Sequence, residues 1–265
     1  MFLKISFPIC HKMVRSIIHA GGQSTRIKNV FDGPKALAPV DGYPLVWFHM
    51  QPLLKSRLVS EYVFTLRHQH ETVQEYIDRM KKKFDVKTHS IVEPRPLGRA
   101  GSIRLGIEQE KIDMDSPYIM SHPDDLIPIN IKELMDYAYD VKRRGKCMVV
   151  VMAKHTKSPF GIGVAKEIGS MWELKYFKEK PELPLIDGHY ANTGMTLFLP
   201  EAMKDFKNVP LDRLTHPEEE IIPNLVKRGK VAVFLVDRWI SVNHGSEYKK
   251  ITEMGQEKLL KFLDV

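Results

Sequence analysis

A loop of small and cationic residues follows the first apolar segment of the chain. The stretch "AGGQSTR" covers residues 20 to 26, and Lys35 follows shortly after it. Gly21 and Gly22 let the backbone approach a ligand closely, and successive N–H groups in such a turn can bind an anion. Arg26 can hold a phosphate with its planar fork, and Lys35 can add a compact charge. The loop therefore indicates a phosphate site, with an ordinary strand-to-helix turn as the alternative.

Two adjacent carboxylates form a second group that could do chemistry. Asp124 and Asp125 close the stretch "SPYIMSHPDD", which reads as a strand. A helix pattern, "NIKELM", begins soon after them, so capping of that helix is an alternative role for the pair. Capping suits Asp125 better than Asp124, and Asp124 is the stronger candidate for binding a cation.

The elements that must position these groups alternate along the first half of the chain. Apolar spacing predicts strands at 14–20, 61–67, 86–92, 116–125 and 146–153, with helices at 44–56, 71–84, 100–110 and 130–144. This order predicts an α/β fold with a doubly wound, mostly parallel sheet and helices on both faces. Ligands bind outside the carboxyl ends of such strands, so the glycine loop and the Asp pair should face one crevice.

The second half of the chain has a different pattern of predicted strands. Shorter, partly antiparallel strands are expected at 160–167, 170–180 and 188–199, followed by a helix, a strand and a C-terminal helix. We therefore expect one compact unit with two lobes, 13–153 and a smaller mixed α/β lobe at 154–265. Met13 precedes the first convincing strand, so residues 1–12 are interpreted as an N-terminal extension.

Composition narrows the class of protein. The net charge of +7 is moderately basic, but the densest cationic runs lie at the ends of predicted helices, where they complement the helix dipole. We therefore expect no nucleic acid as partner. The two Cys residues lie far apart in the sequence, as is typical of a reducing, cytoplasmic setting. No apolar run is long enough to span a bilayer, so we expect no membrane partner.

The glycine loop and the residues after it, "AGGQSTR…GPKALAPVDGYPLV", resemble the signature of sugar-1-phosphate nucleotidyltransferases, also called NDP-sugar pyrophosphorylases. The closest likeness is to the mannose-1-phosphate guanylyltransferase-like members. Five further motifs are similar to those of the family and follow in the same order: "EPRPLGRAGSI", "SHPDDL", "FKEKP", "YANTGMTLF" and "EEEIIPNLVKRGKVAVFLVDRWISV". An ordered set across almost the whole chain is much more specific than any one motif.

The resemblance implies a Rossmann-like nucleotidyltransferase fold and an enzyme of NDP-sugar biosynthesis. An oxygen of a sugar-1-phosphate would attack the α-phosphorus of an NTP, and pyrophosphate would leave. The 13–153 lobe would bind the nucleotide, and the 154–265 lobe would bind the sugar phosphate. Mg²⁺ would be the cofactor. The resemblance allows a homo-oligomer, since relatives often form dimers or tetramers, but the sequence leaves the oligomeric state open.

The resemblance also implies roles for individual residues. Arg26 and Lys35 would hold the triphosphate, and Asp124 would bind Mg²⁺, which gives three catalytic residues. The remaining nucleotide-binding residues would be Ala20, Gly21, Gly22, Glu93 and Gly98. The sugar phosphate would contact Gly161, Glu179, Lys180 and Asn192.

The choice of base depends on Glu93, at a position where many relatives carry Gln. A carboxylate only accepts hydrogen bonds, and guanine offers two donors on its pairing edge whereas uracil and thymine offer one. Glu93 therefore favours GTP. Backbone groups near Gly98 could read other bases instead.

The chain departs from the family pattern at several positions. Ser24 replaces a glycine, which is tolerable if its φ is negative; His19 replaces Leu, Arg99 replaces Thr, and His122 and Pro123 precede Asp124 where Gly is expected.

The gravest departure is Ser241, which stands where the family carries a metal-binding Asp. Asn243 points to the same side of that strand and could bind Mg²⁺ through its carbonyl. Two alternatives to the enzyme therefore stay open: a regulatory homologue that binds sugar nucleotides without turnover, and a cytidylyltransferase acting on another phosphorylated small molecule.

Overall fold

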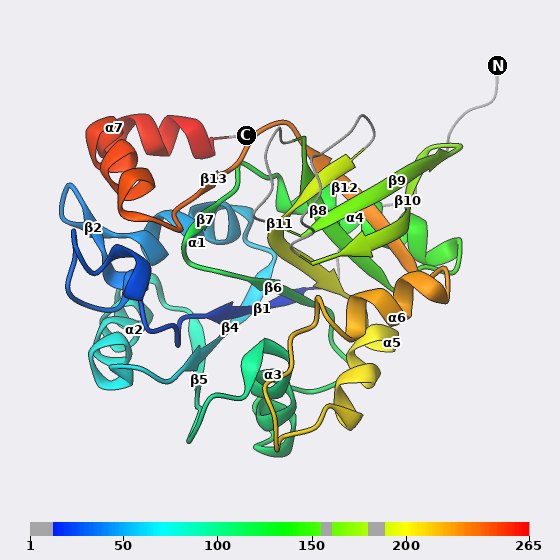
Figure 1. Ribbon diagram of the computed structural model, residues 1–265, viewed down its shortest axis with the longest axis horizontal. Helices are drawn as coiled ribbons and strands as arrows, with labels where there is room; N and C mark the ends of the chain where they lie inside the picture. Colours follow the sequence, from blue (N-terminus) through cyan, green and yellow to red (C-terminus); the bar gives the residue numbers. More distant parts are fainter. Residues whose placement is uncertain (1–12, 155–160, 180–188, 265) are drawn as a thin grey trace.

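The protein is described by a computed structural model that covers residues 13–154, 161–179 and 189–264. A nine-stranded sheet runs through the molecule with helices against both faces (Figure 1). Its strand order is β5-β4-β1-β6-β11-β8-β12-β10-β9. The first four of these strands are β5 (Lys87–Val92), β4 (Val59–Leu66), β1 (Val14–His19) and β6 (Tyr118–Ser121). The other five are β11 (His189–Phe198), β8 (Met148–Ala153), β12 (Val231–Val236), β10 (Met171–Lys178) and β9 (Ile162–Ile168).

The first half of the chain follows the sequence prediction closely. Strands β5, β4, β1 and β6 are parallel neighbours, so their carboxyl ends meet at one edge of the sheet. The chain between successive parallel strands must cross over, and helices form those crossovers. These helices are α1 (Leu45–Ser56), α2 (His70–Phe84) and α3 (Gly98–Glu108). Their apolar faces lie against the sheet, α1 and α2 in one core cluster and α3 in the opposite one.

Strand β11 changes the character of the sheet. It lies antiparallel between β6 and β8, although it comes from the second half of the chain. Within the described part of the nine-stranded sheet, four strand pairings are parallel and five are antiparallel. The α/β class is confirmed, but the doubly wound, mostly parallel sheet is not. Strands from both predicted lobes share one sheet, and the boundary between 153 and 154 stays a prediction.

The remaining helices cover both faces and one end of the sheet. Helix α4 (Ile131–Arg143) is capped by Asn130, whose Oδ1 accepts hydrogen bonds from Lys132 N at 3.0 Å and Glu133 N at 3.2 Å. The other helices are α5 (Pro200–Met203), α6 (Ile221–Lys227), α7 (Gly245–Leu263) and the 3-10 helices η1 (Thr25–Ile27), η2 (Lys35–Leu37) and η3 (Lys204–Asn208).

Two short ladders complete the fold: β2 (Pro39–Val40) with β3 (Tyr43–Pro44), and β13 (Ile240–Ser241) with β7 (Asp125–Leu126). No helix within these residues is long and apolar enough to cross a membrane.

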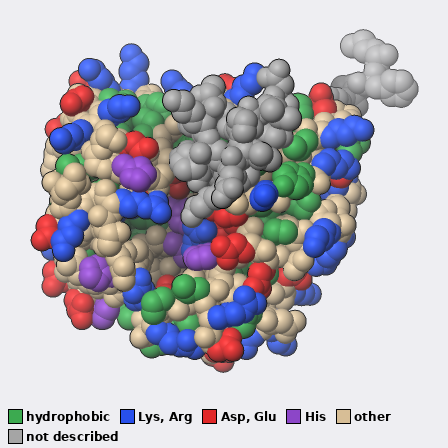
Figure 2. Space-filling view, in the orientation of Figure 1, with side chains coloured by type: hydrophobic (Ala, Val, Ile, Leu, Met, Phe, Trp, Pro, Cys, Tyr) green, Lys and Arg blue, Asp and Glu red, His purple; other side chains and the backbone are tan. Residues whose placement is uncertain are grey.

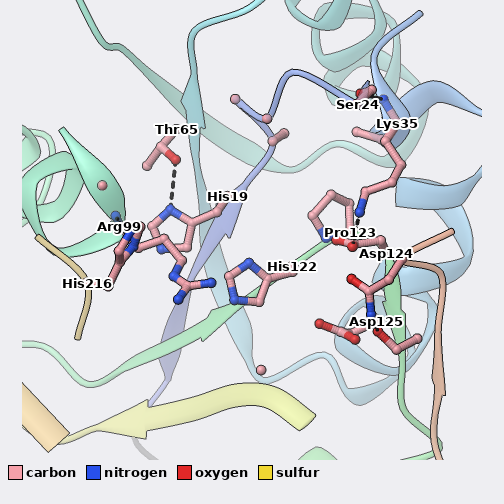
Figure 3. A pocket seen from close by; sticks show the side chains of 18 of the residues that line it. His19, Ser24, Lys35, Thr65, Arg99, His122, Pro123, Asp124, Asp125 and His216 are labelled. Atoms are coloured by element: carbon pink, nitrogen blue, oxygen red, sulfur yellow. Dashed lines mark hydrogen bonds and ion pairs between the residues drawn. The ribbon is translucent and has the colours of Figure 1, made fainter. Parts of the chain in front are cut away.

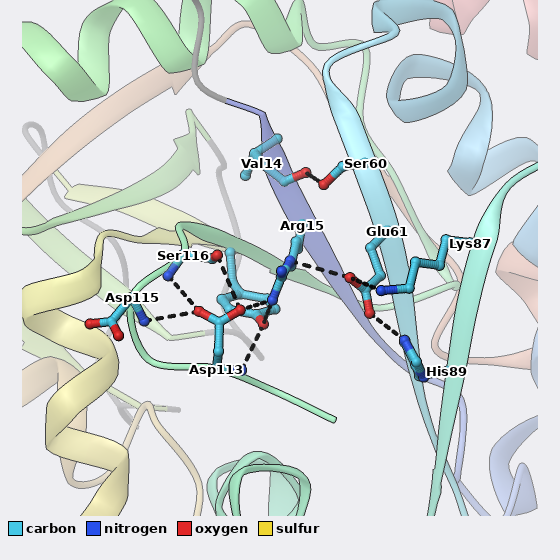
Figure 4. Close-up of polar contacts among 10 residues, drawn as sticks. Val14, Arg15, Ser60, Glu61, Lys87, His89, Asp113, Asp115 and Ser116 are labelled. Atoms are coloured by element: carbon cyan, nitrogen blue, oxygen red, sulfur yellow. Dashed lines mark hydrogen bonds and ion pairs between the residues drawn. The ribbon is translucent and has the colours of Figure 1, made fainter. Parts of the chain in front are cut away.

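A polar network lies near the amino ends of β1 and β4, away from the glycine loop (Figure 4). The buried carboxylate of Glu61 contacts Arg15 Nε at 3.3 Å, Lys87 Nζ at 3.3 Å and His89 Nε2 at 2.5 Å. Arg15 also pairs with Asp113, whose Oδ1 accepts from two backbone N–H groups. A buried carboxylate needs such partners, so this network supports the fold rather than the crevice.

Candidate functional site

A cleft of about 550 Å³ opens at the carboxyl ends of the parallel strands. Histidine and charged side chains surround the hollow at the centre of this face (Figure 2). Twelve of the thirteen residues that the sequence assigns to a site line it: Ala20, Gly21, Gly22, Arg26, Lys35, Glu93, Gly98, Asp124, Gly161, Glu179, Asn192 and Asn243. The thirteenth, Lys180, lies outside the described residues. The expectation that the glycine loop and the Asp pair face one crevice is confirmed.

The glycine loop leaves β1 in a tight space. A Cβ on Gly21 would lie 3.0 Å from the backbone nitrogen of Arg67 and 3.1 Å from the backbone carbon of Leu66, so glycine lets this loop pack against the end of β4. Ser24 has φ of 59°, so the condition of a negative φ, under which a serine would be readily tolerated, is not met. Its Oγ accepts a hydrogen bond from Lys35 N at 2.6 Å, which ties the loop to η2 and compensates for the left-handed conformation.

The two predicted phosphate-binding cations differ in their surroundings. Arg26 is exposed and, within the described part of the chain, has no ion-pair or hydrogen-bond partner. The Lys35 ammonium instead pairs with the Asp124 carboxylate and donates to Val242 O at 3.3 Å (Figure 3). A cation and the carboxylate proposed to bind Mg²⁺ therefore neutralise each other in the cleft.

Asp125 is buried next to this pair and does not cap a helix. The capping alternative is wrong for Asp125, because Asn130 caps α4. The register of β7 and β13 places Ser241 opposite Asp125, and their side chains are hydrogen-bonded. Trp239 Nε1 donates to Asp125 Oδ1 at 3.0 Å. Burial, followed by the charge of Asp124, raises the pKa of Asp125 to about 7.

Asn243 completes this end of the cleft. Its Nδ2 donates to Ser241 Oγ at 2.8 Å, and its backbone N–H donates to Glu247 Oε2 at 2.6 Å. The same oxygen accepts from His244 N at 2.8 Å, and that bond belongs to the capping box that starts α7. Asn243 thus lies beside the two carboxylates, and its role as a metal ligand stays a prediction.

Glu93 and Gly98 hold the start of α3. Glu93 Oε1 accepts from the Ser102 hydroxyl at 2.7 Å, and Oε2 accepts from Leu97 N at 3.2 Å. Gly98 has φ of +76°, and a Cβ there would lie 2.4 Å from Thr215 O. Both residues line the cleft, but the contacts described above join them to other residues of the protein. Glu93 as a reader of the base stays a prediction.

The sugar-phosphate candidates Gly161, Glu179 and Asn192 lie together in the lining of the cleft. A Cβ on Gly161 would lie 2.5 Å from Glu179 Oε2, so these two residues are in contact. Asn192 N donates to Gly161 O at 2.8 Å, and Asn192 Oδ1 accepts from Gly194 N at 3.0 Å. Gly194 has φ of +83° and allows close approach to Asp125, because a Cβ would lie 2.6 Å from Asp125 Oδ2. The buried Asn192 therefore sits in a wall that reaches the acidic end.

Sequence reasoning gave no role to a group of histidine and arginine side chains in the same cleft. His19 and His122 stack with ring centroids 5.5 Å apart, and the Arg99 guanidinium extends toward them (Figure 3). His216 Nδ1 accepts from Arg99 N at 3.4 Å. His19, Arg99 and His122 stand out in the sequence as departures from the family pattern, but only the fold shows that their side chains lie together.

The comparison with known sequences identifies the family. The family model described as "Nucleotidyl transferase" matches residues 15–248. The chain belongs to the nucleotidyl transferase family. The resemblance drawn from the ordered motifs is thereby confirmed. Mannose-1-phosphate guanyltransferase of Saccharomyces cerevisiae is 25% identical over 250 residues, which cover 94% of this chain and 66% of that protein. The chain thus spans slightly less than two thirds of that relative's length.

Solved structures of other proteins share the fold. A putative glucose-1-phosphate thymidylyltransferase from Bacillus anthracis superposes with a TM-score of 0.71 at 19% identity, covering 91% of this chain and 94% of that one. HddC from Yersinia pseudotuberculosis, complexed with GMP-PN, gives a TM-score of 0.68 at 19% identity and covers 91% of this chain and 99% of that one. At these identities the likeness shows the α/β fold alone.

Proposed function

We propose that this nucleotidyl transferase makes an NDP-sugar and pyrophosphate from an NTP and a sugar-1-phosphate, with Mg²⁺ as cofactor. The observation that carries the proposal is the gathering of twelve separately predicted residues in one cleft. The 25% identity to a protein named mannose-1-phosphate guanyltransferase supports a sugar-1-phosphate as acceptor and a guanine nucleotide as donor.

The reaction needs positioning and charge neutralisation and no protein nucleophile. A sugar-phosphate oxygen forms a bond to the α-phosphorus, and the bond from that phosphorus to the pyrophosphate oxygen breaks. In this proposal the N–H groups of Gly21 and Gly22 and the charges of Arg26 and Lys35 hold the triphosphate. Glu179 and Asn192, which line the same cleft, orient the sugar.

The donor set at the acidic end fits Mg²⁺. Mg²⁺ prefers oxygen ligands and usually takes one or two carboxylates from the protein. Asp124 and Asp125 supply carboxylates, and the hydroxyl of Ser241 and the amide carbonyl of Asn243 stand beside them. These residues would hold the ion, which when bound would shield the negative charge of the phosphates.

A matrix of nucleoside triphosphates and sugar-1-phosphates, with released pyrophosphate as the readout, tests the proposal. We expect turnover for at least one pair and its loss in Asp124→Asn. The control is Lys142→Ala, which removes an exposed cation from α4, outside the cleft. Absence of pyrophosphate release across the matrix would reject catalysis.

One observation favours a second candidate, a sugar-nucleotide-binding homologue without turnover. Ser241 stands where the resemblance implies a metal-binding Asp, and Lys35 already neutralises Asp124. A wild type that binds nucleotides but releases no pyrophosphate, together with turnover gained by Ser241→Asp, would support this candidate. Turnover by the wild type would reject it.

A further inference from the structure

Five polar side chains form one lobe of the cleft that the proposed reaction does not use. His19 ends β1, His122 follows β6, Arg99 lies in the first turn of α3, and His216 and Glu218 precede α6. We call this group the histidine–arginine lobe. In the close view of the cleft, His19, Arg99 and His216 lie on the far side of His122 from the Lys35–Asp124 pair (Figure 3). Four separate parts of the chain thus bring chemistry-bearing side chains to one place.

Three nitrogen atoms of this lobe are buried and lack a partner. Nε2 of His19, Nε2 of His122 and Nε of Arg99 have no hydrogen bond in the described part of the chain. A buried polar atom without a partner loses its hydration and gains nothing in return, so native proteins seldom leave one unsatisfied. Several such atoms in the wall of one cleft indicate a bound molecule that supplies the missing partners.

The charge of the lobe favours an uncharged polar group over a phosphate. Burial, followed by the neighbouring His122 and Arg99, lowers the pKa of His19 well below its usual value. The His19 ring is therefore neutral near pH 7. Arg99 Nη2 donates to the buried Glu218 Oε2 at 2.8 Å, which balances the guanidinium charge.

The guanidinium sets the hydrogen-bond pattern of the missing partner. It carries five N–H donors and no acceptor, and only one donor has a partner in the described structure, Glu218. Its planar fork complements two adjacent acceptor atoms, such as O6 and N7 of guanine. Cytosine also has two adjacent acceptors, O2 and N3. Adenine has no two adjacent acceptors, because its amino donor lies beside both N1 and N7. Uracil has the N3–H donor between its acceptors O2 and O4.

We propose that Arg99, positioned by Glu218, reads two adjacent acceptor atoms of the nucleotide base and thereby selects guanine or cytosine. The proposal rests on the proposed function and deepens it by naming the residue that chooses the base. Glu93 is less suited to this task because Ser102 and Leu97 already donate to its two oxygens. The open nitrogens of His19 and His122 complete the lobe around the base.

Calorimetric titration of the purified protein with GTP, 7-deaza-GTP, CTP, ATP and UTP tests the proposal. 7-deaza-GTP differs from GTP by the loss of the N7 acceptor. For a guanine site we expect GTP to bind about tenfold more tightly than 7-deaza-GTP, ATP or UTP. In Arg99→Thr this preference should fall to about one. Arg104→Thr is the matched control, because it removes an arginine from the same helix outside the cleft.

The titrations distinguish a guanine site from a cytosine site, and failure of the base-reading role from failure of the proposed function. A cytosine site is indicated if CTP binds most tightly and loses about tenfold in Arg99→Thr while UTP does not. A wild type that ranks ATP or UTP first, or an Arg99→Thr variant that keeps the wild-type ranking, would overturn the base-reading role alone. A wild type that binds none of the nucleotides would overturn the proposed function as well. Arg99→Lys retains the charge without the planar fork and should lose the same base preference. The ratio of the affinities for GTP and 7-deaza-GTP is measured on the wild type alone, so that comparison needs no variant.

Discussion

The Lys35 ammonium is paired with the Asp124 carboxylate, although 88 residues lie between them in the sequence. Lys35 comes from the glycine-loop side of the cleft, and Asp124 comes from the end of β6. The same ammonium donates to Val242 O at 3.3 Å, next to Ser241. One cation thus connects the three segments that the reaction would need together, and it shields a carboxylate that would otherwise repel phosphates.

Removal of the cleft cations tests whether they hold the triphosphate. We expect Arg26→Ala and Lys35→Ala each to raise the Kd for the preferred NTP by about tenfold or more, because charge-assisted hydrogen bonds to phosphate would be lost. Titration calorimetry measures this, with Lys142→Ala as the control for a loss of one positive charge. An unchanged Kd would remove the altered residue from the phosphate site.

Asp125 should give the stability of the protein a dependence on pH. Its pKa of about 7 lies above the usual value of about 3.9, so the folded state binds this proton more tightly than the unfolded state. The stabilisation is complete below about pH 4 and is lost as pH rises toward 7. We expect Asp125→Asn to gain stability relative to the wild type as pH rises across this window, by on the order of 4 kcal/mol at its upper end.

Urea unfolding of both proteins at pH 5, 6, 7 and 8 measures that difference, in which the other titrating groups cancel. Added Mg²⁺ should diminish it by favouring the charged carboxylate. A difference between variant and wild type that stays constant with pH would contradict the assignment.

Glu93→Gln separates two roles for that residue. If Glu93 reads the base, the variant should shift preference toward UTP or dTTP. The observed bonds from Ser102 and Leu97 lead us to expect a loss of about 1–3 kcal/mol in stability and an unaltered base ranking. Thermal unfolding and the nucleotide titrations measure both quantities, and a changed ranking with full stability would return the base-reading role to Glu93.

The network around Glu61 should matter for stability and not for binding. Glu61→Ala removes the carboxylate that Arg15, Lys87 and His89 share (Figure 4). We expect a loss of about 2 kcal/mol, because charged hydrogen bonds contribute at that scale. Nucleotide affinity should be unchanged, since none of these four residues lines the cleft. A weakened nucleotide affinity in a well-folded variant would show that the network supports the cleft.

Local signals in the sequence predict much of the site. The glycines and cations near residue 21 and the carboxylates at 124 and 125 lie at strand ends, and a parallel arrangement brings such ends together. The helix pattern also places α4 within a residue of the observed bounds, although the cap is Asn130 and not Asp125. These features depend on neighbours along the chain or on one general rule of sheet topology.

The rest depends on contacts between distant segments. The antiparallel insertion of β11 between β6 and β8 cannot be read from apolar spacing, because a buried strand has the same pattern in either direction. The pairing of Asp125 with Ser241 requires the register of two two-residue strands. The meeting of His19, Arg99 and His122 requires the whole fold, and each residue alone reads only as a departure from a motif.

Phosphorus NMR of the preferred NTP mixed with the preferred sugar-1-phosphate and Mg²⁺ tests the central claim most directly. The account predicts that NDP-sugar and pyrophosphate appear in equal amounts while both substrates disappear, and that Asp124→Asn abolishes both products. Orthophosphate or nucleoside diphosphate as the product, or an unchanged spectrum from protein that binds the NTP, would contradict the claim of nucleotidyl transfer.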